Sequence, residues 1–433
     1  MWAARRIPAT VIDLAVAFCS KLGNIMVQLE VIFDHRLDEQ RLAQAFILLQ
    51  EAHPVLGCRL VIKTWQGYWE ELPREQRNHL IVVHDSSAYE AFRSEALSAE
   101  RGPQIHACLF RDGEDDRLLL KITHEASDAG GLKETSRTLA EIYNRLLREP
   151  TYRPVSDWSA QRGMGQVLRR IPPSAFPRIF ADLGFFRETI EIARQESVRT
   201  PSATAPLAAA GEWGPHVPSR VVDRERVNQL RHYGRAYGAT TNDLFLAAMF
   251  RTIAQLQGAN AHHQLALTVD LRRYLPQGRG ATVDDLSGIE FVGLETDGQD
   301  FAKNLRQVVA ATRARKKNFI GINGFTALVP LIRPFPPRLI QMVMNMFIRR
   351  VIPSAGIPSA LTNMGEIRPE MVHFDRPARL AYMFPPPIYP PMCAAGISGH
   401  QGAVVLSSGT FARAGEVSPA ERFLDLVLSN LPC

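Results

Sequence analysis

The feature that most constrains the fold is the alternation of strand-like and helix-like patterns, which runs through the chain twice. Residues 25–33 (IMVQLEVIF) are typical of a buried strand, and residues 37–52 then place their apolar side chains on one helical stripe. After residue 219 the alternation returns, with helices expected over 223–238 and 243–256 and a strand over 265–271. Two such halves predict two α/β layers that face each other.

The length and the breaks in pattern indicate the domain organisation. At 433 residues the chain is longer than one hydrophobic core usually grows. Residues 151–218 are rich in Pro, Ser, Ala and Arg and keep one helical pattern, over 180–195. We therefore expect an N-terminal subdomain over 1–150, a connecting region over 151–218 and a C-terminal subdomain over 219–433.

Charge and cysteine content exclude several classes of function. The net charge of +6 is spread over a long chain, which argues against nucleic-acid binding. Five scattered cysteines without a C-x-x-C pair fit a reducing compartment, so we expect a cytoplasmic protein. No run of about 18 apolar residues lacks a charge, and a membrane span is not expected; residues 339–348 come closest.

One basic cluster leaves two interpretations open. Arg313, Arg315, Lys316 and Lys317 follow a helical pattern, and cations at a helix C-terminus are favoured by the helix dipole even when they only face solvent. The alternative is that they dock the phosphates of a coenzyme or the acidic face of a carrier protein.

The strand over 117–123 ends in an unusual way. It delivers His124 into a turn that contains Asp128 and two glycines, and an amphipathic helix follows over 132–147. Such a strand end is either a purely structural turn or part of the active site of an enzyme. Asp128 alone could simply cap the helix, which Asp does well.

Two other chemistries fit the sequence less well. His124-Glu125-x-x-Asp128 imitates a zinc motif, but that motif needs an uninterrupted helix and here a strand precedes it and glycines follow, so no metal is expected. Ser398, in GISGH, lacks the spacing of a nucleophile elbow and is predicted to lie in a turn.

Taken in order, these segments resemble the chloramphenicol acetyltransferase-like superfamily, which includes peptide-synthetase condensation domains, polyketide-associated acyltransferases and the plant BAHD acyltransferases. The family signature H-H-x-x-x-D-G is similar to residues 123–129, with Thr123 in place of the first histidine and Ala129 in place of the glycine. VDLRRYLP resembles the family's D-x-R segment, GATTNDLFLAAM the helix start before it, and LTNMG the strand that crosses between the halves.

The resemblance implies a fold and a set of site residues. The fold is α/β, with two chloramphenicol acetyltransferase-like subdomains in a V-shaped pseudo-dimer around a central tunnel. His124 would be the general base, held by the backbone of its turn, and Asp128 would support the site by pairing with Arg272. The backbone near Gly130 and the pair Thr362 and Asn363 are the candidate oxyanion or tunnel groups, and the residues do not decide between them.

The implied activity is that of a stand-alone condensation-type acyltransferase in secondary metabolism. It would move an acyl group from a thioester to a small-molecule hydroxyl or amine, without a cofactor of its own. Coenzyme A or the phosphopantetheine of a carrier protein acting in trans would carry the donor, and we expect a monomer. The departures at Thr123 and Ala129 leave an alternative, a catalytically silent relative that binds carrier proteins as a platform.

Overall fold

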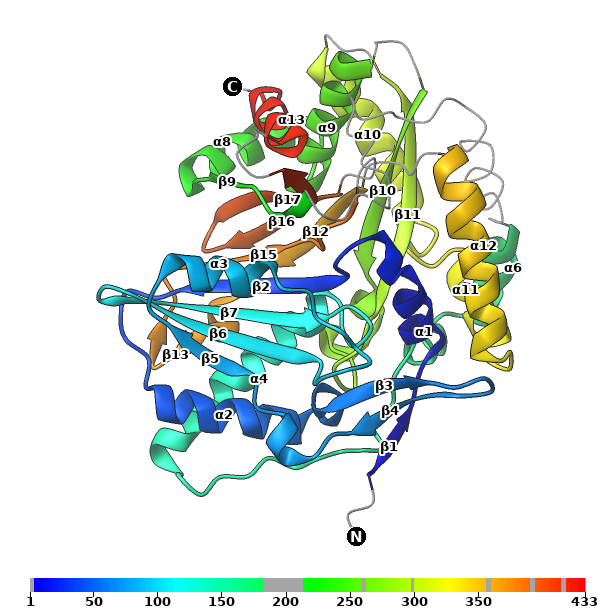
Figure 1. The fold of residues 1–433 in the computed structure, drawn as a ribbon. Coiled ribbons are helices and arrows are strands. Elements are labelled where there is room, and N and C mark those ends of the chain that lie inside the picture. The colour runs from blue at the N-terminus through cyan, green and yellow to red at the C-terminus, as the bar shows by residue number, and fades with distance from the viewer. Residues whose placement is uncertain are drawn as a thin grey trace.

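Two lobes, each built on a β-sheet, form the computed structural model (Figure 1). The structure describes residues 4–181, 213–257, 262–296, 300–355, 360–389, 394–413 and 418–432. In Figure 1 the N-terminal lobe lies below, in blue and cyan, and most of the C-terminal lobe lies above, in green to red.

The N-terminal lobe contains a five-stranded sheet in the order β15-β2-β7-β6-β5. Its strands are β2 (Met26–Ile32), β5 (Leu80–Val83), β6 (Ile105–Asp112), β7 (Asp115–Thr123) and β15 (Leu380–Phe384). Three helices accompany them: α2 (Glu39–Ala52), α3 (Ser86–Ser94) and α4 (Ala129–Arg148). The helices α2 and α4 pack against each other, and their apolar stripes share one core with the strands.

The C-terminal lobe contains a seven-stranded sheet in the order β11-β10-β12-β16-β17-β8, with β9 also paired to β17. Its strands are β8 (Trp213–His216), β9 (Ser219–Val222), β10 (His262–Asp270), β11 (Ser287–Glu295), β12 (Ala360–Glu366), β16 (Ala394–His400) and β17 (Ala403–Arg413). The second core forms between this sheet and the helices α8 (Arg224–Arg235), α9 (Thr241–Gln257), α10 (Phe301–Lys316) and α13 (Pro419–Ser429).

One strand from the C-terminal half of the sequence, β15, belongs to the sheet of the N-terminal lobe. This strand pairs antiparallel with β2, from Leu380 opposite Ile32 to Phe384 opposite Gln28, and so completes the N-terminal sheet. Residues 364–383 also contribute buried side chains to the N-terminal core. The two halves therefore fold around shared strands, and the predicted boundaries at 150 and 218 stay predictions.

A third apolar cluster joins the lobes. It combines α1 (Val11–Phe18) and the connecting segments α5 (Gly165–Leu168) and α6 (Phe176–Ala181) with residues near the end of β10 and with α11 (Gly324–Ile332). The helix α12 (Pro337–Ala355) packs on α1. A small sheet in the order β1-β4-β3 (Arg6–Pro8, Gly67–Glu71, Cys58–Ile62) and the pair β13 (His373–Phe374) and β14 (Arg376–Pro377) complete the fold.

Most of the predicted elements are present, and one local prediction is wrong. Ser398 does not lie in a turn, because it belongs to β16, a fully buried strand between β12 and β17. Most of the helix predicted over 180–195 lies outside the described residues. In the described part of the chain, no helix combines the length and the apolar character that a membrane span requires.

Candidate functional site

The turn after β7 is closed by its own backbone. The amides of Ala126 and Ser127 both donate to the carbonyl of Thr123, at 3.1 and 3.2 Å. The amide of His124 donates to the carbonyl of Ile25 at 3.1 Å, which ties the turn to the neighbouring strand. Backbone hydrogen bonds alone therefore define the shape of the turn.

The Asp128 carboxylate connects this turn to the other half of the sequence. One oxygen accepts a hydrogen bond from the amide of Gly131 at 2.8 Å and caps α4. The other accepts from Arg272 Nη1 at 2.8 Å, from the amide of Leu286 at 2.9 Å and from Ser287 Oγ at 3.0 Å. Both interpretations of Asp128 from the sequence hold at once: it caps a helix and it pairs with Arg272.

Arg272 lies two residues after the end of β10 and donates hydrogen bonds to three residues. Besides Asp128, it donates to Asp270 Oδ1 at 3.1 Å and to the carbonyl of Asp284 at 2.8 Å. Burial alone would raise the pKa of Asp128, but the charge and hydrogen bonds of Arg272 and the two amides outweigh it, and the pKa is lowered. Asp128 is therefore an anion at neutral pH.

The two glycines are explained by the same contacts. A Cβ on Gly130 would stand 2.4 Å from Arg272 Nη1 and 2.8 Å from Asp270 Oδ2, and a Cβ on Gly131 would stand 2.1 Å from Ser127 Oγ. The start of α4 can approach the guanidinium only because no side chain intervenes. At Ala129, the position of the family's glycine, the chain has already turned away into α4.

The His124 imidazole lies against a carboxylate that the sequence did not single out. Its Nδ1 is 3.0 Å from Oδ2 of Asp285, although the two atoms lack the alignment of a hydrogen bond. The ring is 24% exposed and Asp285 is 4% exposed. The sequence predicted that the backbone of the turn would hold this ring, and the structure adds a carboxylate close to it, from a residue before β11.

The ion pair changes the protonation of His124. Burial by itself would lower the pKa of the imidazole, but Asp285 and, more weakly, Asp128 outweigh it and raise the pKa to about 9. Because the unfolded value is about 6.5, the pair stabilises the fold fully below pH 6.5 and loses that effect as the pH rises through about 9. Asp285 could have been suspected from the adjacent Asp284-Asp285 carboxylates directly before a strand.

Thr123, which replaces the family's first histidine, is part of the core. Its hydroxyl donates to Gln104 Oε1 at 2.5 Å, and the Gln104 amide in turn donates to the carbonyls of Cys58, Ala99 and Gly102. Thr123 is buried, and its role in this structure is to fix the end of β7.

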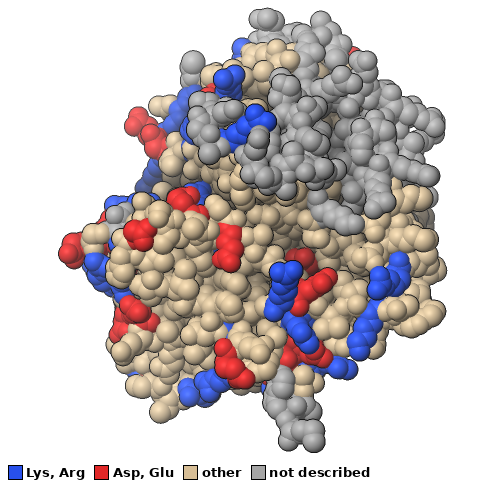
Figure 2. Space-filling model, in the orientation of Figure 1, with Lys and Arg blue, Asp and Glu red and all other residues tan. Residues whose placement is uncertain are grey.

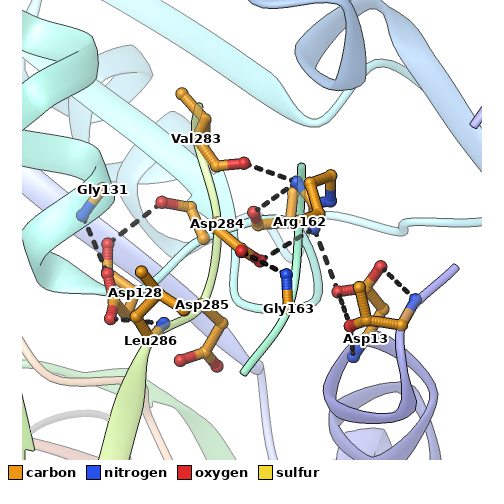
Figure 3. A network of polar contacts seen from close by, with 12 residues as sticks. Asp13, Asp128, Gly131, Arg162, Gly163, Val283, Asp284, Asp285 and Leu286 are labelled. Atoms are coloured by element: carbon orange, nitrogen blue, oxygen red, sulfur yellow. Dashed lines mark hydrogen bonds and ion pairs between the residues drawn. The ribbon is translucent and has the colours of Figure 1, made fainter. Parts of the chain in front are cut away.

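The connecting region supplies a buried arginine to the same cluster (Figure 3). Arg162 donates to the carbonyl of Val283 at 2.6 Å and to that of Ala126, inside the histidine turn, at 3.3 Å. Its other nitrogen donates to Asp13 Oδ1 at 3.0 Å, and Asp284 Oδ1 is 3.6 Å away. Residues 151–181 are therefore part of the support of the site, beyond the connecting role that the sequence indicated.

Two predicted residues lie apart from this cluster. Thr362 and Asn363 lie on β12, where Asn363 donates to Asn242 Oδ1 at 3.2 Å. In the described hydrogen-bond network neither residue contacts His124 or Asp128. Two links join β12 to the site: Thr362 pairs with Thr268 of β10, and Lys133 of α4 donates to the carbonyl of Met364 at 2.7 Å.

One described pocket lies away from this cluster. A pocket of about 540 Å³ is lined by residues 172–179 and 314–322, including Arg315 and Lys317 of the basic cluster, and not by His124 or its partners. No group of three His, Cys, Asp or Glu suited to a metal occurs among the residues that the structure describes. The central tunnel stays a prediction.

Comparisons with known proteins identify the fold. No family model and no curated protein matches the chain. Among solved structures, polyketide synthase associated protein 5 from Mycobacterium tuberculosis has a TM-score of 0.70 at 16% identity, with 99% of this chain and 98% of that chain covered. The first condensation domain of the CDA synthetase has a TM-score of 0.69 at 16% identity, with 99% and 95% covered.

A third neighbour is the trichothecene 15-O-acetyltransferase from Fusarium sporotrichioides, with a TM-score of 0.69 at 12% identity and 98% and 95% covered. The chain therefore has the fold of this condensation domain, of the polyketide synthase associated protein and of the acetyltransferase over nearly its whole length. The predicted chloramphenicol acetyltransferase-like fold, two α/β lobes in a V-shaped pseudo-dimer, is confirmed.

We expect Asp128→Asn to destabilise the protein by about 3 kcal/mol, because it leaves the buried Arg272 without its anion. Thermal and denaturant unfolding measure the loss. The matched control is Asp425→Asn, which removes a carboxylate from an exposed pair with Arg220 and should cost at most about 1 kcal/mol. Equal stability of the two variants would contradict the assignment.

We also expect the His124 ring to titrate near pH 9 in the folded protein and closer to 6.5 in Asp285→Asn, because the substitution removes the charge that favours the imidazolium. Histidine side-chain NMR, assigned through His124→Gln, measures both values. A titration of His124 that is the same in both proteins would rule out the ion pair.

Proposed function

We propose that the protein is a condensation-type acyltransferase that uses His124 as its general base. The acyl group moves from a thioester to a hydroxyl or amine of a small molecule. The observation that carries the proposal is the His124–Asp285 pair, which lies at the turn where residues from both lobes meet and leaves the ring partly exposed.

The chemistry follows from the two ring nitrogens. Nδ1 faces the Asp285 carboxylate, so the proposal assigns Nε2 to the acceptor. Nε2 takes the proton of the acceptor O–H or N–H as the acceptor attacks the thioester carbonyl, and Asp285 stabilises the imidazolium that forms. The tetrahedral intermediate then expels the thiolate, which takes the proton back from His124, and the base is regenerated.

The supporting residues act through position. Asp128, Arg272 and the glycine-containing helix start hold the turn, and their role is to keep His124 in place. The amide of Gly130 and the pair Thr362 and Asn363 stay the candidate oxyanion donors. Coenzyme A or a carrier protein acting in trans is the proposed donor carrier, and no metal or resident cofactor takes part in the proposed reaction.

A non-catalytic platform that binds carrier proteins is the second candidate. Two observations favour it: Thr123 is tied to Gln104 in the core, and the His124 imidazole is mostly protonated at neutral pH. Such a protein would bind the same partners without needing His124.

The two functions separate in one experiment. We expect His124→Ala to lower the rate of acyl transfer by at least about 100-fold, because it removes the base. Intact-mass analysis with a panel of acyl-coenzyme A and acyl-carrier donors and with amine and alcohol acceptors measures the products. His84→Ala, at an exposed histidine, is the control. If folded His124→Ala transferred the acyl group at the rate of the wild type, the assignment of His124 as the general base would be wrong.

The pH dependence gives an independent prediction. Since only the neutral ring can accept a proton and its pKa is raised to about 9, kcat/KM should increase with pH up to about 9. In Asp285→Asn the inflection should move toward 6.5, with a lower maximum because the imidazolium is no longer stabilised. Rates measured from pH 5 to 10 in both proteins test this, and an unchanged inflection would contradict it.

A further inference from the structure

An apolar stripe on α12 faces away from the protein. Leu339, Met342, Val343 and Met346 are between 39% and 62% exposed. Their spacing is i, i+3, i+4 and i+7, which places all four side chains on one face of the helix. In a surface helix this spacing normally marks the face that packs on the core.

Two more exposed apolar residues shortly precede α12 in the sequence. Leu331, at the end of α11, and Phe335, in the turn before α12, are 62% and 52% exposed. The helix α12 already packs on α1, so the stripe is not the surface that holds the helix in place. We call these six residues the α12 stripe: Leu331, Phe335, Leu339, Met342, Val343 and Met346. Soluble proteins rarely expose large apolar side chains in one continuous row without a use for them.

The charge of the same region is strongly one-sided. Residues 318–365 contain four arginines (Arg333, Arg338, Arg349 and Arg350) and no Lys, Asp or Glu. Arg333 and Arg338 are exposed and lie in sequence between members of the stripe. Figure 2 shows the described Lys, Arg, Asp and Glu residues on the face of the molecule that Figure 1 presents.

These properties favour one kind of partner. A second copy of the chain would bring two such basic regions together, and like charges oppose that contact. A helix that lies in a membrane interface has an apolar face, arginines beside it and few acidic residues, and it binds anionic lipid. The α12 stripe has each of these features, and no described helix is suited to cross the bilayer.

We propose that the α12 stripe docks the protein on the surface of an anionic membrane, with the apolar side chains among the acyl chains and Arg333 and Arg338 at the lipid headgroups. The inference goes beyond the proposed acyltransferase activity and does not depend on it.

Vesicle co-flotation of the full chain tests the proposal. The protein should bind vesicles of phosphatidylcholine with about one third phosphatidylserine, bind pure phosphatidylcholine at least about tenfold more weakly, and detach in high salt. The variant Leu339→Gln/Met342→Gln/Met346→Gln should lose binding to the anionic vesicles at least about tenfold. Glutamine keeps the helix propensity close to that of Leu and Met, so the fold should survive.

The matched control is Leu147→Gln/Val155→Gln/Val221→Gln, at three exposed apolar residues outside the stripe, and it should bind like the wild type. His124→Ala should also bind like the wild type, which separates this proposal from the catalytic one. Absence of vesicle binding, or equal binding by the stripe variant, would overturn the proposal. So would a stripe variant whose only change is loss of self-association or of binding to an acidic carrier protein.

Discussion

The structure depends on one buried carboxylate. Asp128 can keep its charge inside the protein because one local and two distant parts of the chain reach it: the nearby amide of Gly131, the guanidinium of Arg272, and the amide and hydroxyl at Leu286 and Ser287. Removing an ion from water costs several kcal/mol, and only such a complete set of hydrogen bonds offsets that cost. Asp128 therefore ties the turn that presents His124 to the start of β11.

The same constraint explains features that look unrelated in the sequence. Gly130 and Gly131 are glycines because the guanidinium and Ser127 occupy the space of a side chain. Arg162 belongs to the segment between the two halves of the sequence, yet it is buried at the site. It donates to the carbonyl of Ala126 from the N-terminal half and to that of Val283 from the C-terminal half, and both buried carbonyls need a donor. The segment after α4 is thus drawn back to the site by hydrogen bonding, and its irregular composition does not make it a mere linker.

The sequence predicted two kinds of feature: helices and strands with a clear local periodicity, and contacts that a known family motif implies. Periodicity alone indicated α2, α4 and β7, and the family resemblance paired Asp128 with Arg272 across 144 residues. The strand β16 was missed because its glycines suggest a turn, whereas Gly396 is pressed against Met364 and Pro385 and Gly399 against Glu366, neighbours that only the folded chain provides. Asp285 was missed for a similar reason: the adjacent carboxylates of Asp284 and Asp285 before β11 could draw attention to it, but they do not say that its partner is His124.

Burial and ion pairing together set the protonation of the site. Five buried carboxylates surround the turn, and three cations accompany them: Asp13, Glu125, Asp128, Asp284 and Asp285 against Arg162, Arg272 and His124. Burial raises the pKa of both Glu125 and Asp284 to about 7, so near neutral pH these two carboxyls can hold protons and the remaining three charges of each sign balance. The carboxylate of Asp285, with a weaker contribution from Asp128, outweighs burial at His124 and raises the pKa of this ring to about 9. A neutral imidazole with a raised pKa is a strong base. At pH 7, however, only about one ring in a hundred is neutral. The Asp285 carboxylate therefore strengthens the base and also lowers the fraction of molecules in which the base can accept a proton.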